Sequence, residues 1–160
     1  MKIATYLVEG QRFVGLVSAD DLTVTALDLP RADALRGALA VIETLAAGGK
    51  LPATTGSPIS LAAVALDAPI PLPRRNLWCV GRNYHAHAKE LAASVFKDNS
   101  ANTEEWPIVF TKVPECVVGP HDAVRVPVEV TTAVDYEAEL AVVIGKGGKN
   151  ITRAAAMEHV

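Results

Sequence analysis

The sequence contains few cysteines and few aromatic residues. Its only cysteines, Cys79 and Cys116, both stand among apolar residues, so we expect buried, reduced thiols of a cytoplasmic protein rather than a disulfide framework or a cysteine metal site. Aromatic residues make up 5% of the chain and apolar residues 50%. We therefore expect a core of real size that is built from Val, Leu, Ile and Ala.

The sequence also lacks an excess of basic residues and a long apolar run. Its 15 Lys and Arg stand against 18 Asp and Glu, a formal net charge of −3, which argues against nucleic acid or an anionic membrane as the main partner. No apolar run approaches the roughly 20 residues that span a membrane. The first residues, Met1 to Thr5, lack the apolar block of a signal peptide.

A connector at residues 51–73, rich in Pro, Ser, Thr and Ala, predicts two parts in this chain of 160 residues: a small α/β N-terminal domain over residues 1–72 and a second part over residues 73–160. No chemical group stands out in the first part, so we expect it to serve packing, lid support or dimer contact. Its residue pattern predicts a meander of three strands, a helix and one strand in the connector, at residues 3–8, 12–17, 22–27, 32–47 and 61–66.

The second part is predicted to be mainly β. A long polar stretch at residues 96–106 is predicted to be either a mobile lid over the substrate or plain surface disorder. Strands are expected at residues 76–81, 107–112, 113–120 (irregular), 124–127 and 134–146, and helices at residues 85–93 and 153–160, the last with Thr152 as N-cap.

Two glutamates lie on the expected strand at residues 134–146. Because strand side chains alternate, Glu137 and Glu139 are expected on one face, about 6.6–6.8 Å apart at their Cα atoms. Two carboxylates there repel each other beside an apolar run, and an oxygen-preferring divalent cation would resolve this. The alternative, which the pattern alone favours, is a solvent-facing edge of an antiparallel strand.

His87 and Glu90 are three residues apart on the expected helix at residues 85–93, so they share a face. A carboxylate that orients an imidazole is typical of proton transfer. An ordinary surface contact is the more frequent alternative. Lys112, at the end of its strand, either clamps a substrate carboxylate or is a surface lysine with a packed stem.

Taken together, these stretches resemble the fumarylacetoacetate hydrolase family. The resemblance covers roughly residues 74–160, whereas residues 1–72 resemble only loosely the small N-terminal domain of many bacterial members. It is carried by Trp78-Cys79-Val80-Gly81-Arg82-Asn83-Tyr84 with His87 and Glu90, by Phe110-Thr111-Lys112 with Pro114, by Val118-Gly119-Pro120, and by Asp135-Tyr136-Glu137-Ala138-Glu139-Leu140-Ala141-Val142-Val143-Ile144-Gly145-Lys146.

The resemblance implies an α+β, mainly β fold, a mixed β-sandwich roll, with a site for Mg²⁺, or alternatively Mn²⁺ or Ca²⁺. The implied reaction is C–C bond hydrolysis in a small 2-oxo or 1,3-dioxo carboxylate, such as an acylpyruvate or a diketo-deoxy sugar acid. Oxaloacetate decarboxylation or enol–keto isomerisation is the alternative, and a homodimer is implied. The implied site residues are Glu137 and Glu139 as metal ligands, His87 and Glu90 as the catalytic dyad, and Lys112, Arg82 and Tyr84 as substrate-binding residues.

The resemblance also implies a third acidic ligand in an Asn-Asp segment that would lie beyond Val160. We therefore expect the chain to be a fragment of a longer protein. We also expect it to have unclosed strand edges, which are prone to association. A partner chain that completes the site and a degraded relative are the alternatives.

Two other classes of function stay open. The chain could be a non-catalytic binding or assembly module that uses its apolar strands as a dimer face. Alternatively, Cys79 or Cys116 could be the nucleophile of an enzyme, but neither has a histidine that the sequence places beside it.

Overall fold

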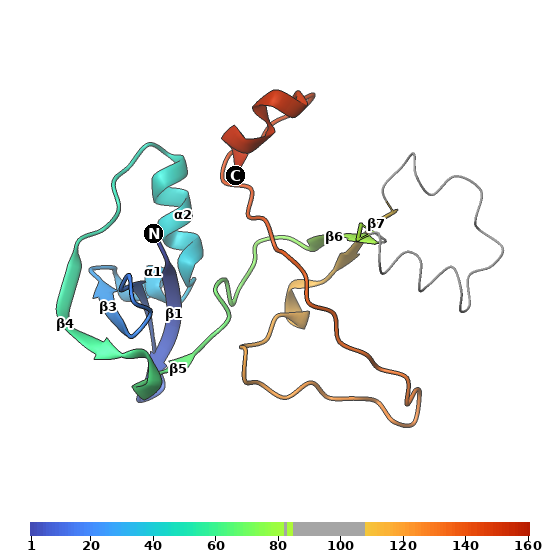
Figure 1. Ribbon diagram of the computed structural model, residues 1–160, viewed down its shortest axis with the longest axis horizontal. Coiled ribbons are helices and arrows are strands. Elements are labelled where there is room, and N and C mark those ends of the chain that lie inside the picture. The colour runs from blue at the N-terminus through green and yellow to red at the C-terminus, as the bar shows by residue number, and fades with distance from the viewer. Residues whose placement is uncertain (82, 85–107) are drawn as a thin grey trace. The chain divides into compact units, whose positions relative to one another are not determined.

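The computed structural model describes residues 1–81, 83, 84 and 108–160 (Figure 1). The chain divides into two compact units, one formed by Met1–Pro71 with Val118–Val160 and the other by Leu72–Val117. Among the described residues strands outnumber helices, which confirms the expected mainly β class. The assignment of domains to residues 1–72 and 73–160 stays a prediction. Among the described helices, none has the length and apolar content needed to cross a bilayer.

The first unit contains an antiparallel sheet of five strands in the order β4-β3-β2-β1-β5. The predicted meander is confirmed by the ladders between β1 and β2 and between β2 and β3. A two-residue turn joins β1 to β2, and Glu9 and Gly10 both have positive φ, as a hairpin turn of this length favours. The strands are β1 (Ile3–Val8), β2 (Gln11–Val17), β3 (Thr23–Leu27), β4 (Thr54–Ser60) and β5 (Ala65–Leu66).

The core lies between this sheet and the helices drawn beside it in Figure 1. Val14, Leu27 and Val41 form a buried cluster, as expected for an aliphatic core. Tyr6 is the aromatic exception: it is buried and stacks on Phe13 with ring centroids 5.8 Å apart. Burial raises the pKa of the Tyr6 hydroxyl, because the ionised form is poorly solvated there.

The helix expected at residues 32–47 is two helices, α1 (Arg31–Ala34) and α2 (Ala38–Ala46). Gly37 breaks the run with φ 65° and ψ −150°, a conformation that costs little only for glycine. A Cβ at this position would lie 2.6 Å from the Pro69 carbonyl oxygen. The break is therefore dictated by contact with the connector, which helical periodicity does not reveal.

The expected strand at residues 61–66 is wrong in its extent. A short 3₁₀ turn occupies Leu61–Ala63, and β5 keeps only Ala65–Leu66. β4 was not expected from the sequence, because its residues include glycine and proline and are all exposed. Glycine and proline content and full exposure are typical of an edge strand. Proline is tolerated there because its missing amide hydrogen can face solvent instead of a neighbouring strand.

The second unit contains an antiparallel pair, β6 (Leu77–Gly81) and β7 (Ile108–Lys112), which confirms the strands expected there. Leu77 lies opposite Lys112 and Gly81 lies opposite Ile108. Apolar side chains on both faces are substantially exposed, including Trp78 and Phe110. The irregular strand expected at residues 113–120 is wrong, because Pro114–Cys116 form a 3₁₀ turn. Cys116 is exposed and Cys79 half-buried, so the expectation of two buried thiols is also wrong; both are free.

The strands expected at residues 124–127 and 134–146 are not formed. Neither segment belongs to any described ladder, and a strand without a hydrogen-bonded neighbour is not stable by pattern alone. The final helix is 3₁₀, Arg153–His159, and Thr152 precedes it without a side-chain capping bond. The backbone amides of Gly145 and Lys146 donate to the His159 carbonyl oxygen at 2.9 and 3.2 Å, which closes the loop between them.

Candidate functional site

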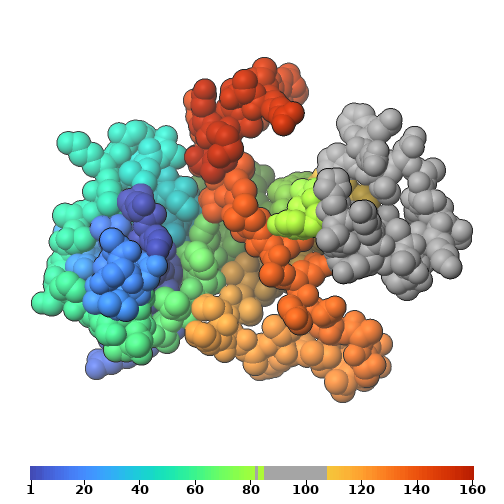
Figure 2. Space-filling view, in the orientation of Figure 1, coloured from blue at the N-terminus to red at the C-terminus, as the bar shows by residue number. Residues whose placement is uncertain are grey.

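Glu137 and Glu139 lie on an exposed stretch outside any described strand. Figure 2 shows this stretch, in orange, at the surface. The apolar residues that follow are exposed as well, with Leu140 at 83% and Ile144 at 63% of their full surface. The two carboxylates are therefore accessible, and the burial that we expected to force them together is absent.

The donor chemistry of these two glutamates fits a hard divalent cation in kind, because such ions take carboxylate oxygens. In the part of the chain that the structure describes, no group of three or more His, Cys, Asp or Glu side chains could hold a metal ion. A site that includes Glu137 and Glu139 therefore needs donors from outside the described residues.

Lys112 and Tyr84 belong to the second unit, and both are exposed. The register places Lys112 opposite Leu77, whereas Tyr84 follows Gly81 at the other end of the two-stranded sheet. The four steps from Ile108 to Lys112 span about 14 Å at the usual rise per strand residue. The two strands thus do not by themselves bring Lys112 beside the segment that follows β6.

The other expected site residues, His87, Glu90 and Arg82, lie outside the described residues, as do the expected helix at 85–93 and the loop at 96–106. Their roles stay predictions.

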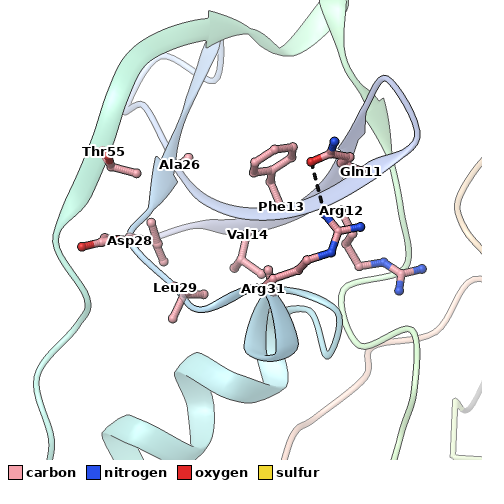
Figure 3. Close-up of a pocket in the computed structure, with 11 residues that line it drawn as sticks. Gln11, Arg12, Phe13, Val14, Ala26, Asp28, Leu29, Arg31 and Thr55 are labelled. Carbon is pink, nitrogen blue, oxygen red and sulfur yellow. Dashed lines mark hydrogen bonds between the residues drawn. The ribbon is translucent and has the colours of Figure 1, made fainter.

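One pocket in the first unit was missed by the sequence analysis. It measures about 200 Å³, and Figure 3 shows Arg31 extending from α1 toward Gln11 at the start of β2. Its basic residues are 19 positions apart and belong to no motif, so the sequence carries no signal for it. The lining residues are Gln11, Arg12, Phe13, Val14, Ala26, Leu27, Asp28, Leu29, Arg31, Ala34 and Thr55.

An ion pair fixes one side of this pocket. The Arg12 Nε donates to Asp67 Oδ2 at 2.7 Å, and the Arg12 Nη1 donates to the Leu35 carbonyl oxygen at 3.0 Å. The two charged side chains keep only 23% and 11% of their surface exposed. Arg12 therefore joins β2 to both the connector and the end of α1.

Comparison with known proteins gives three kinds of match. The sequence model described as "Fumarylacetoacetate (FAA) hydrolase C-terminal" matches residues 76–160. The chain is 39% identical to "Oxaloacetate tautomerase YisK" of Bacillus subtilis, over 100% of this chain and 57% of that protein. It is 43% identical to "Oxaloacetate tautomerase fahd2, mitochondrial" of Xenopus laevis, over 64% of this chain and 29% of that protein.

A solved structure also matches, that of a fumarylacetoacetate hydrolase from psychrophilic Exiguobacterium antarcticum. The TM-score is 0.67 at 27% sequence identity, and the match covers 99% of this chain and 52% of that one. The chain thus spans little more than half the length of the relatives that it matches from end to end.

Proposed function

Because the chain belongs to the fumarylacetoacetate hydrolase family and has its fold, we propose that it supplies part of an active site that interconverts the keto and enol forms of oxaloacetate or a similar 2-oxo acid. The observation that carries this proposal is the 39% identity, along the whole chain, to a protein named as an oxaloacetate tautomerase. Relatives from vertebrates bear the same name.

Glu137 and Glu139 would hold a divalent cation, with Mg²⁺ proposed and Mn²⁺ or Ca²⁺ as alternatives. The cation would supply electrostatic stabilisation for the negative charge that develops on the 2-oxo oxygen. Since these two carboxylates are accessible, the proposal requires further donors that approach them from outside the described residues.

His87, oriented by Glu90, would move the proton. The imidazole takes a proton from C3 of the keto form, the C–H electron pair becomes the C2–C3 double bond, and the carbonyl pair moves to the 2-oxo oxygen, which receives a proton. The reverse steps return the keto form. No bond between carbons breaks, so no water is consumed.

Lys112, Arg82 and Tyr84 would bind the substrate carboxylates. Lys112 and Tyr84 flank opposite ends of the two-stranded sheet. Because only two carbons separate the carboxylates of oxaloacetate, the side chains of Lys112 and Tyr84 would have to converge on one substrate from the two ends of the sheet. A guanidinium suits a carboxylate by its paired donors, whereas an ammonium acts as a point charge.

Hydrolysis of a C–C bond is the second candidate function. It is favoured by the match to the solved fumarylacetoacetate hydrolase, and it would use the same His87 and Glu90 to activate water instead of removing a substrate proton. An acylpyruvate is the matching probe, because its cleavage consumes one water and yields two acids.

The test follows the ultraviolet absorbance of enol-oxaloacetate as it converts to the keto form, and acylpyruvate cleavage in parallel. We expect the protein to catalyse this conversion in a Mg²⁺-dependent manner. The conversion rate should fall at least about a hundredfold in His87→Ala and in Glu137→Gln. Glu129→Gln, another exposed carboxylate of the same stretch, is the matched control and should keep full activity.

Activity that persists in chelator would contradict the metal assignment. Equal loss of metal affinity and of turnover in His87→Ala would contradict its role in proton transfer. Cleavage of acylpyruvate without tautomerisation of oxaloacetate would favour the second candidate over the first.

A further inference from the structure

The geometry points to a second binding site, in the pocket of the first unit, for a small monocarboxylate with an apolar body. The site is separate from the family's proposed chemistry, because none of Glu137, Glu139, Lys112 or Tyr84 lines it.

The pocket opens where two strands diverge. The ladder between β2 and β3 pairs Val17 with Val24 and ends at Gly15 opposite Ala26. By this register the first residues of β2, Gln11 to Phe13, face positions 28–30, which lie beyond the end of β3, and they line the pocket. Helix α1 contributes Ala34 and Arg31 to the same pocket, and Figure 3 shows Arg31. The opening is therefore a consequence of the sheet's register, and strand and helix residues line it together with Asp28 and Leu29 of the segment between β3 and α1.

The volume sets the size of the ligand. A pocket of about 200 Å³ holds the volume of roughly seven waters. This is below the range of about 300–1,000 Å³ that is typical for larger ligands. The ligand is therefore a molecule of about six to eight non-hydrogen atoms. Most lining side chains are apolar, namely Phe13, Val14, Ala26, Leu27, Leu29 and Ala34, so most of the ligand is apolar too.

The charge of the ligand follows from the two arginines. The Arg12 guanidinium already donates to the Asp67 carboxylate and to the Leu35 carbonyl oxygen. Arg31 is exposed, and its described partner is the neutral Gln11 side chain, with Nη1 and Oε1 3.4 Å apart. A guanidinium that is held toward a pocket by one long bond to an amide has donors left for a carboxylate.

Asp28 limits the ligand to a single carboxylate. In Figure 3, Asp28 and Thr55 lie on the opposite side of the pocket from Gln11 and Arg12. A second negative group on the ligand would extend toward Asp28 and be repelled by it. This separates the proposed ligand from a dicarboxylate such as oxaloacetate.

The experiment is a titration of the isotope-labelled chain followed by amide chemical shifts. Butyrate is the probe, butyramide is the neutral analogue of the same shape, and succinate is the dicarboxylate. We expect butyrate to cause saturable shifts at Phe13, Val14 and Leu29, and the other two compounds to bind more weakly. Arg31→Gln should weaken butyrate binding about fivefold, as the loss of one exposed charge contact.

Two variants serve as controls. Arg31→Lys retains the charge and should keep most of the butyrate affinity. Lys2→Gln removes another exposed cation of the same unit, one that pairs with Asp21 away from the pocket, and should leave the affinity unchanged. The proposal is overturned if butyrate causes no saturable shift, if butyramide or succinate binds equally well, or if Arg31→Gln binds butyrate as the original chain does.

Discussion

At the scale of single residues, buried polar contacts tie the connector to the first sheet. The Thr5 hydroxyl donates to the Pro69 carbonyl oxygen at 2.8 Å and accepts from the Ala38 amide at 3.2 Å. Together with the ion pair of Arg12 and Asp67, this contact satisfies groups that the fold takes out of water.

Removing one member of that ion pair should destabilise the protein clearly. In Arg12→Met, the Asp67 carboxylate stays mostly buried without its charged partner, and we expect a loss of about 2 kcal/mol in the free energy of unfolding. Lys2→Met breaks an exposed ion pair with Asp21 and should cost less than about 1 kcal/mol. Urea denaturation measures both, and equal losses would contradict the importance of burial.

None of these contacts could be predicted from the sequence. The partners Arg12 and Asp67 are 55 positions apart, and no local pattern links them. The geometry of the candidate site could not be predicted either. The family resemblance identified Glu137 and Glu139, but the expected distance between them holds only if they lie on a strand. That strand is not formed.

At the scale of elements, prediction of the first sheet succeeded where a segment's pattern and its partner are both local. β1, β2 and β3 follow one another through short turns, so alternation and turn residues locate them. β4 and β5 pair with strands far away in the sequence and lack the β-branched alternation of a central strand. The helix break at Gly37 depends on Pro69, which is also distant.

Gly37 offers a test at this scale. We expect Gly37→Ala to lose about 3 kcal/mol in the free energy of unfolding, because the new Cβ meets the Pro69 carbonyl oxygen at 2.6 Å in a backbone conformation that disfavours side chains. Gly48→Ala is the matched control: its φ is also positive, at 79°, but no atom lies within 4 Å of the added carbon. It should lose only about 1 kcal/mol, and an equal loss would show that the contact is unimportant.

At the scale of the whole molecule, the two faces of the β6–β7 pair remain exposed in the part of the chain that the structure describes. Trp78 is 73% exposed on one face and Phe110 is 44% exposed on the other, although a sheet with two apolar faces is normally covered on both.

The 160-residue chain should therefore self-associate and bind a hydrophobic dye. We expect Phe110→Ser to raise the dissociation constant of self-association about tenfold, because it removes an exposed aromatic side chain. Thr111→Ser, the neighbouring position of the same strand, should leave it unchanged. Light scattering across a concentration series measures both, and it also tests the expected homodimer. A chain that stays monomeric and binds no dye would contradict this prediction.

The path of the connector along β1 has a mechanical consequence. Residues 65–69 run antiparallel to β1, with Leu66 opposite Tyr6, the Asp67 amide bonded to the Thr5 carbonyl oxygen and Pro69 held by the Thr5 hydroxyl. Met1 and Pro71 consequently leave the sheet at the same end. Tension applied between them would peel the connector away one bond at a time, starting from Pro69, rather than shear the whole ladder at once. Under tension, the connector residues 65–69 would therefore separate from β1 before β1 separates from β2.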